Sequence, residues 1–152
     1  MTKTPTLLLI RGTVGSGKTT AAYKWLDEAP DWRIRVNRDD IRGQIAGKFW
    51  GLTRQQEENV SALALAQVEV ALKAQLSVVI DDASNLRASV AKGWMKIAKK
   101  YGANVEFLDI DTTLEVAIER DKNRERTVGE DVVRSFYDRF YVKVQSTSHS
   151  CT

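Results

Sequence analysis

The sequence is poor in three residue types that often cross-link or bend small proteins. It has one cysteine, one histidine and two prolines among its 152 residues. The lone Cys151 excludes an internal disulfide and predicts a reducing compartment, the cytoplasm. His149 and Cys151 together are too few ligands for a zinc site. Pro5 and Pro30 mark no linker, so we expect a single folded domain.

Long apolar runs are missing as well. No stretch approaches the roughly 20 apolar residues that span a bilayer, and we expect neither a secretion signal nor a membrane segment. The composition, 43% hydrophobic and 28% charged, is that of an ordinary globular protein. A net charge of +3 with a pI near 9.0 is only a mild indication of an anionic partner.

Predicted strands and helices alternate along the chain. The predicted strands are residues 6–11, 33–36, 77–80 and 104–110. The predicted helices are residues 18–28, 41–46, 54–75, 87–101, 113–122 and 130–142. This alternation predicts an α/β fold, a parallel sheet flanked by helices, whose ligands bind beyond the carboxyl ends of the strands. We expect one domain over residues 1–142 and a polar, disordered tail over 143–152.

Two of these helices begin with capping signals. Thr53 with Gln56, and Thr112 with Glu115, have the spacing of a capping box. The helix after Thr53 is apolar on more than one face, which predicts that it is packed deeply.

A phosphate-binding loop follows the first predicted strand. Its sequence fits the pattern G-x-x-x-x-G-K-[ST], and every residue is a candidate contact of ATP: Gly12, Thr13, Val14, Gly15, Ser16, Gly17, Lys18 and Thr19. Glycines let successive N–H groups turn toward one phosphate, and the following helix adds its positive dipole end. Lys18 can reach the β- and γ-phosphates, and the Thr19 hydroxyl is a candidate Mg²⁺ ligand.

Two other interpretations of the loop are weaker. A plain tight turn is disfavoured because strand, loop and helix follow in the required order. A dinucleotide-binding fold is excluded because Gly15-x-Gly17 is followed by Thr20, where that fingerprint needs glycine or alanine.

Polar motifs also follow the second and third predicted strands. Asn37-Arg38-Asp39-Asp40-Ile41-Arg42 is either a polar helix start capped by Asp39 or Asp40, or a site. In the second case a carboxylate accepts the proton of an attacking hydroxyl and an arginine holds an anionic acceptor. Asp81 and Asp82 end the third strand, where an acid orders magnesium or caps a helix.

A basic run lies between the last two predicted helices. It contains Arg120, Lys122, Arg124 and Arg126. Such a run is often a solvated helix end. Beside a phosphate loop we favour a lid whose arginines neutralise the transferred phosphoryl group.

Aromatic residues stand in the connection 47–51. Phe49 and Trp50 there either stack on a base or pack beneath the long helix.

Taken together, the loop at 12–19, the Arg-Asp-Asp-x-Arg element, residues 82–86 and residues 131–137 resemble the polynucleotide 5′-hydroxyl kinases of T-even bacteriophages. The resemblance extends to about Tyr141. It implies a P-loop NTPase fold with a helical lid, ATP as phosphate donor, Mg²⁺, and 5′-OH ends of DNA or RNA as acceptor. For a phage protein, the compartment would be the host cytoplasm.

The resemblance also implies roles for individual residues. Asp39 would be the general base, and the catalytic set would be Asp39, Lys18 and Arg124. Lid contacts to the donor phosphates would come from Arg120, Arg124 and Arg126. Arg126 is the alternative to Arg124, because the segment before Val128 is shorter than in the family. Acceptor contacts would come from Arg38, Arg42, Asp82 and Val128, and the metal would be held by Thr19 and Asp82.

Two other functions remain open from the sequence. One is a small-molecule kinase acting on a sugar, a nucleoside or an antibiotic, because such enzymes share the loop and the sheet. The other is a nucleotide-dependent switch that binds ATP without transfer, which a carboxylate at Asp39 disfavours.

Overall fold

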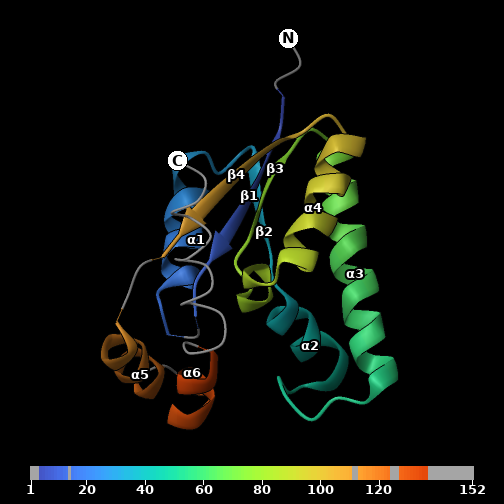
Figure 1. The fold of residues 1–152 in the computed structure, drawn as a ribbon. Helices are drawn as coiled ribbons and strands as arrows, with labels where there is room; N and C mark the ends of the chain where they lie inside the picture. Colours follow the sequence, from blue (N-terminus) through green and yellow to red (C-terminus); the bar gives the residue numbers. More distant parts are fainter. Residues whose placement is uncertain (1–3, 14, 111–112, 124–126, 137–152) are drawn as a thin grey trace.

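The computed structural model describes residues 4–13, 15–110, 113–123 and 127–136 (Figure 1). Within these residues, strands and helices alternate as predicted. The elements are β1 (Thr6–Arg11), α1 (Lys18–Glu28), β2 (Arg33–Val36), α2 (Arg38–Ala46), α3 (Arg54–Lys73), β3 (Ser77–Ile80), the 3₁₀ helix η1 (Ala83–Leu86), α4 (Ala88–Lys100), β4 (Asn104–Asp109), α5 (Leu114–Lys122) and α6 (Glu130–Phe136).

The four strands form one parallel sheet in the order β2-β3-β1-β4. On β1, Leu8 pairs with Val79 of β3 on one side and with Glu106 of β4 on the other. Because all strands run in one direction, their carboxyl ends meet at a single edge. Figure 1 shows α2, α5 and α6 gathered at that edge. The predicted α/β fold with a helix-flanked parallel sheet is confirmed.

Helices cover both faces of the sheet. On one face, Leu7 and Leu9 join a cluster that includes residues of α3 and α4. On the other, Leu8 and Ile10 pack against Ala22 of α1. Strand β1 is therefore apolar at every central position, as expected of a strand that is buried on both faces of the sheet. Each fully buried leucine or isoleucine stabilises the fold by about 1.5–3 kcal/mol.

Helix α3 differs from the expectation of deep packing. Only one of its faces is buried, through Val60, Ala64, Val68, Ala71 and Leu72. On its other side Leu63 is 43% and Val70 67% exposed. The expectation was wrong because α3 is an outer layer over one sheet face, so nothing in the described chain packs on its outward side.

Helix α5 begins one residue later than the predicted capping box implies. Thr113, rather than Thr112, is its N-cap, and the Thr113 hydroxyl accepts a hydrogen bond from the Val116 amide at 3.2 Å. Glu115 is then one position short of the place a capping box requires. Thr112 lies outside the described residues, as do the end of the predicted helix at 137–142 and the predicted tail. No helix in the described ranges is long and apolar enough to cross a membrane.

The start of α3 supports a stability prediction. The Thr53 hydroxyl accepts from the Gln56 amide at 3.1 Å, and the Gln56 side chain accepts from the Thr53 amide at 2.9 Å, so the predicted capping box is confirmed. Thr53→Ala should lower the free energy of unfolding by about 1 kcal/mol in urea denaturation. Ser61→Ala, on the exposed side of the same helix, is the control and should cost nothing. Equal losses for the two variants would contradict a specific role of the cap.

Candidate functional site

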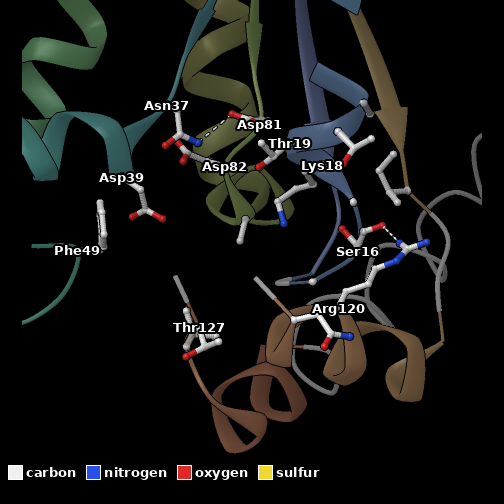
Figure 2. Close-up of a pocket in the computed structure, with 18 of the residues that line it drawn as sticks. Ser16, Lys18, Thr19, Asn37, Asp39, Phe49, Asp81, Asp82, Arg120 and Thr127 are labelled. Atoms are coloured by element: carbon white, nitrogen blue, oxygen red, sulfur yellow. Dashed lines mark hydrogen bonds between the residues drawn. The ribbon is translucent and has the colours of Figure 1, made fainter. Parts of the chain in front are cut away.

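A cleft of about 1510 Å³ opens at the carboxyl edge of the sheet (Figure 2). Its walls come from the β1–α1 loop, the ends of β2 and β3, and α5 with the segment after it. The predicted site residues that line it are Gly15, Ser16, Gly17, Lys18, Thr19, Asp39, Asp82, Arg120 and Val128. Gly12, Thr13, Arg38 and Arg42 are not part of its wall. Val14, Arg124 and Arg126 lie outside the described residues.

The loop between β1 and α1 has no room for side chains at two of its glycines. Gly15 has φ +79°, and a Cβ there would lie 2.1 Å from the carbonyl oxygen of Ala117 in α5. A Cβ at Gly12 would lie 2.5 Å from the Ser16 hydroxyl. Glycine is therefore both a steric and a conformational requirement at Gly15, whereas a side chain at Gly12 would displace the Ser16 hydroxyl.

Polar groups of the loop turn inward. Lys18 Nζ donates to the Thr13 carbonyl at 2.7 Å, and the Ser16 amide donates to the same oxygen at 3.1 Å. The buried hydroxyls of Thr13 and Ser16 have no hydrogen-bond partner in the described chain. Buried hydroxyls are seldom left unpaired in native proteins. Unsatisfied donors and a lysine at a helix N-terminus are the groups that phosphate oxygens need, so the loop fits a phosphate.

Helix α5 carries Arg120 to this loop. The Arg120 Nη1 atom donates to the Ser16 carbonyl at 2.5 Å (Figure 2). It also covers Gly17, since a Cβ at Gly17 would lie 3.1 Å from the same atom. The structure thus brings one predicted lid arginine onto the phosphate loop, where its charge would face an anion held by the loop.

The two strand-end aspartates have different surroundings. Asp81 is buried, accepting from Arg35 Nε at 2.8 Å and from Asn37 Nδ2 at 2.9 Å. Burial would lower the pKa of Arg35, but its attraction to Asp81 and Asp40 outweighs that and raises the pKa above its usual value. Asp81 therefore caps no helix and instead ties β3 to β2, a role that neither sequence interpretation contained.

Asp82 lines the cleft, as Asp81 does, but its surroundings raise its pKa. Burial, followed by the charge of Asp81, raises the pKa of Asp82 to about 6. Its Oδ1 accepts a long hydrogen bond, 3.4 Å, from the Arg38 amide. No group of three or more acidic, histidine or cysteine residues that could hold a metal occurs in the described ranges. A Mg²⁺ ion shared by Asp82, Thr19 and donor phosphates fits this sparse set, because magnesium commonly takes few protein ligands beside phosphates.

Asp39 lies on α2, whose first residues differ from both sequence interpretations. The N-cap is Asn37, whose side chain accepts from the Asp40 amide at 3.1 Å, so neither Asp39 nor Asp40 caps the helix. Helix α2 consequently starts at Arg38, three residues before the predicted start. Asp39 is left half-exposed in the cleft wall, with its carboxylate available for other contacts (Figure 2).

Arg42 lies between the carboxylates of Asp39 and Glu57 and donates hydrogen bonds to both. Arg42 Nη1 donates to Asp39 Oδ1 at 2.8 Å, while its Nε and Nη2 donate to the two oxygens of Glu57, both at 3.0 Å. Burial would lower the pKa of Arg42, but the hydrogen bonds to Glu57 and Asp39 outweigh it and raise the pKa. The hydrogen bond from Arg42 in turn lowers the pKa of Glu57. Arg42 and Glu57 therefore both retain their charge.

Sequence reasoning missed three residues of this region. Glu57 stands one turn into α3, where it looks like an ordinary helix-start acid. Asn85 is buried and donates to the carbonyls of Ile10 and Ile80 at 3.1 and 2.9 Å, which joins the ends of β1 and β3. Asp121 accepts from the two backbone amides that directly precede α6. No spacing rule marks these residues, because each partner is distant in the chain or is backbone.

Asp121 organises the segment before α6. It is 1% exposed, and its two oxygens accept from the amides of Val128 and Gly129 at 3.0 and 2.9 Å. A cluster of Ala117, Ile118 and Val133 joins α5 to α6 directly beside it. Val128, predicted to contact the acceptor, is thereby set in the cleft wall with 39% of its surface exposed.

The loop geometry generates a test by glycine replacement. Gly15→Ala should abolish binding of a fluorescent ATP analogue, because the added Cβ would collide with the Ala117 carbonyl and force the loop or α5 away. Gly93→Ala is the matched control: a Cβ there meets nothing within 4 Å, and Gly93 lies inside α4. This control should keep binding and gain stability. Unchanged nucleotide affinity for Gly15→Ala, with native circular dichroism, would refute the steric argument.

The surroundings of Asp82 predict a pH dependence. The folded-state pKa of about 6 exceeds the usual aspartate value of 3.8, so folding favours the protonated acid. Its contribution to stability is complete below the unfolded pKa and is lost as pH rises through about 6. Asp82→Asn removes this titration, so its free energy of unfolding should rise relative to wild type between pH 5 and pH 8. Urea denaturation at both values measures this, and a pH-independent difference would show that the charged carboxylate is not penalised.

Known proteins share this architecture. A viral protein named as a bifunctional polynucleotide kinase/RNA ligase, from Autographa californica nuclear polyhedrosis virus, is 30% identical over 132 residues, covering 78% of this chain and 18% of its own. A chain in the structure of the Pnkp1/Rnl/Hen1 RNA repair complex has a TM-score of 0.81 at 25% identity, covering 96% of this chain and 47% of that chain. The chain thus spans less than half the length of either relative.

More distant similarity concerns the fold alone. The APS kinase of Mycobacterium tuberculosis, solved with AMPPNP and APS, has a TM-score of 0.61 at 17% identity, covering 79% of this chain and 70% of that chain.

The predicted resemblance to polynucleotide kinases is confirmed by the viral and RNA-repair relatives. The model of the family described as AAA domain matches residues 7–142. With its phosphate loop on a parallel sheet, the chain belongs to this AAA domain family of P-loop proteins.

Proposed function

We propose that this domain is a P-loop phosphotransferase that moves the γ-phosphate of ATP to the 5′-hydroxyl end of DNA or RNA. One observation carries the proposal: the phosphate loop with Lys18 and the carboxylate of Asp39 line the same cleft from different elements (Figure 2). A donor phosphate on the loop and an acceptor hydroxyl at Asp39 would then share one enclosed space. The relatives named above support a polynucleotide as the acceptor.

The donor side would be built from charge and backbone amides. The loop amides, Lys18 and the positive end of α1 would hold the terminal phosphates, and Arg120 would move from the Ser16 carbonyl onto a phosphate oxygen. Magnesium, when held by Thr19, Asp82 and the phosphates, would neutralise charge on the triphosphate. Arg124 and Arg126 are proposed as further lid arginines on the basis of the resemblance.

The acceptor side would be built around Asp39. Arg42 donates to Oδ1, and Oδ2 accepts no hydrogen bond within the described part of the chain. Oδ2 would accept the proton of the 5′-hydroxyl while the hydroxyl oxygen bonds to the γ-phosphorus and the bond to the ADP oxygen breaks. Arg42 would hold the Asp39 carboxylate in position for this step and, with Arg38, would offer positive charge to the phosphate of the first nucleotide.

Substitution of the base tests the assignment. Asp39→Asn should lower kcat for transfer of radiolabelled phosphate to a 5′-OH oligonucleotide by about 10²–10⁴-fold, with little change in ATP binding. Lys18→Ala should remove both transfer and tight ATP binding. Asp27→Asn, on the exposed side of α1 away from the cleft, is the control and should keep wild-type activity. A wild-type kcat for Asp39→Asn would refute its role as the base.

The acceptor class needs its own comparison. A panel of 5′-OH DNA and RNA oligonucleotides, sugars, nucleosides and aminoglycoside antibiotics would be offered with labelled ATP. Transfer to oligonucleotides supports the proposal, and transfer to one of the metabolites alone would replace it with the small-molecule kinase. ATP binding without transfer to any acceptor would favour a nucleotide-dependent switch.

A further inference from the structure

A short loop with two aromatic side chains borders the cleft on the acceptor side. This aromatic loop, residues 47–51, joins α2 to α3 and has the sequence Gly-Lys-Phe-Trp-Gly. Both end glycines have positive φ, +68° at Gly47, the C-cap of α2, and +72° at Gly51, so the loop begins and ends in backbone conformations that favour glycine. Phe49 and Trp50 both line the cleft.

Phe49 is placed on the same side of α2 as the proposed base. A Cβ at Gly43 would lie 3.5 Å from Cε1 of Phe49, so the ring rests on the helix at that position. Asp39 and Gly43 are four residues apart, which puts them on one face of an α-helix. Figure 2 accordingly shows Phe49 next to Asp39, facing the cleft. An apolar ring surface therefore adjoins the point where the 5′-hydroxyl would sit.

Trp50 extends this surface and is 73% exposed, which rules out the interpretation that it packs beneath the long helix. Phe49 is 37% exposed. A large aromatic side chain as exposed as Trp50 in the wall of a polar cleft suits a planar apolar partner with charged edges. The nucleobases of a polynucleotide have this character, and stacking on aromatic side chains is a general way to hold single strands. Lys48 adds positive charge within the same loop, which suits a phosphodiester backbone.

We propose that Trp50, with Phe49 beside it, is a stacking platform for an unpaired base near the 5′ end of the acceptor strand. The inference rests on the proposed function and specifies its substrate: a base inside a duplex is already stacked on its neighbours, so the platform selects single-stranded or overhanging 5′ ends. Trp50 would act on acceptor binding and not on chemistry, because it directly follows Phe49, which lies beside the proposed base.

Kinetics with oligonucleotides tests the platform. Trp50→Ala should raise KM for a single-stranded 5′-OH oligonucleotide by about tenfold or more, with kcat and the affinity for ATP unchanged. Trp50→Phe, which keeps an aromatic ring, should restore most of the affinity. Trp32→Ala is the matched control, because Trp32 is 60% exposed, does not line the cleft and directly precedes β2 at the opposite end of the sheet. Equal KM values for Trp50→Ala and wild type would overturn the inference.

Abasic substrates separate stacking from a merely structural effect. Oligonucleotides lacking the first, second or third base would each be used with wild type and with Trp50→Ala. At the stacked position, loss of the base should raise KM for wild type and remove the difference between the two proteins. If Trp50→Ala raises KM by the same factor with every abasic substrate, no base stacks on Trp50 and the inference is wrong.

Failure of the function itself would look different. If wild type binds ATP but phosphorylates no oligonucleotide, the proposed function fails before the platform is tested by kinetics. Binding of a labelled single-stranded oligonucleotide then remains the test of the platform. Weaker binding by Trp50→Ala and unchanged binding by Trp32→Ala would support it, and equal binding by wild type and Trp50→Ala would overturn it.

Discussion

The turn between β1 and α1 needs a residue without a side chain at Gly15, and the placement of α5 against the phosphate loop depends on that requirement. The Ala117 carbonyl of α5 occupies the space that a Cβ of Gly15 would need. Helix α5 can therefore approach the loop closely, and it brings Arg120 with it. The phosphate loop and α5 are in this way brought together by a contact in which backbone packs on backbone. A phosphate bound by the loop would meet the arginine without a large rearrangement of the fold.

Three aspartates near that turn differ in how closely arginine side chains surround them. Asp81 is buried against Arg35 and holds two strands together. Asp82, the next residue, faces the cleft, and its raised pKa reflects burial without a strong counter-charge. Asp39 is paired with an arginine that Glu57 holds from behind. These contrasts distinguish one carboxylate that supports the sheet from the two for which we propose a metal and a proton.

Much of this architecture follows from local patterns in the chain. The phosphate loop, the four strands and the capping box at Thr53 were predictable, because apolar runs, glycine spacing and capping pairs act over a few residues. The residues at which the helices start were less predictable. Asn37, and not Asp39 or Asp40, is the N-cap of α2. The side chain of Asp39 is therefore not used in capping and lies in the cleft wall. Three neighbouring polar residues can each cap a helix, and only the path of β2 into α2 selects one.

The sequence by itself determined the class of fold, the phosphate loop and the carboxylates at the strand ends, because parallel strands carry their polar termini to one edge. Only the tertiary structure decided how those groups are used. The Arg42–Glu57 pair, the burial of Asp81, the closure of the α5–α6 segment by Asp121 and the position of Phe49 on Gly43 all join parts of the chain whose separation follows no short-range rule. Such contacts arise when helices pack on a sheet, and packing depends on the whole chain at once.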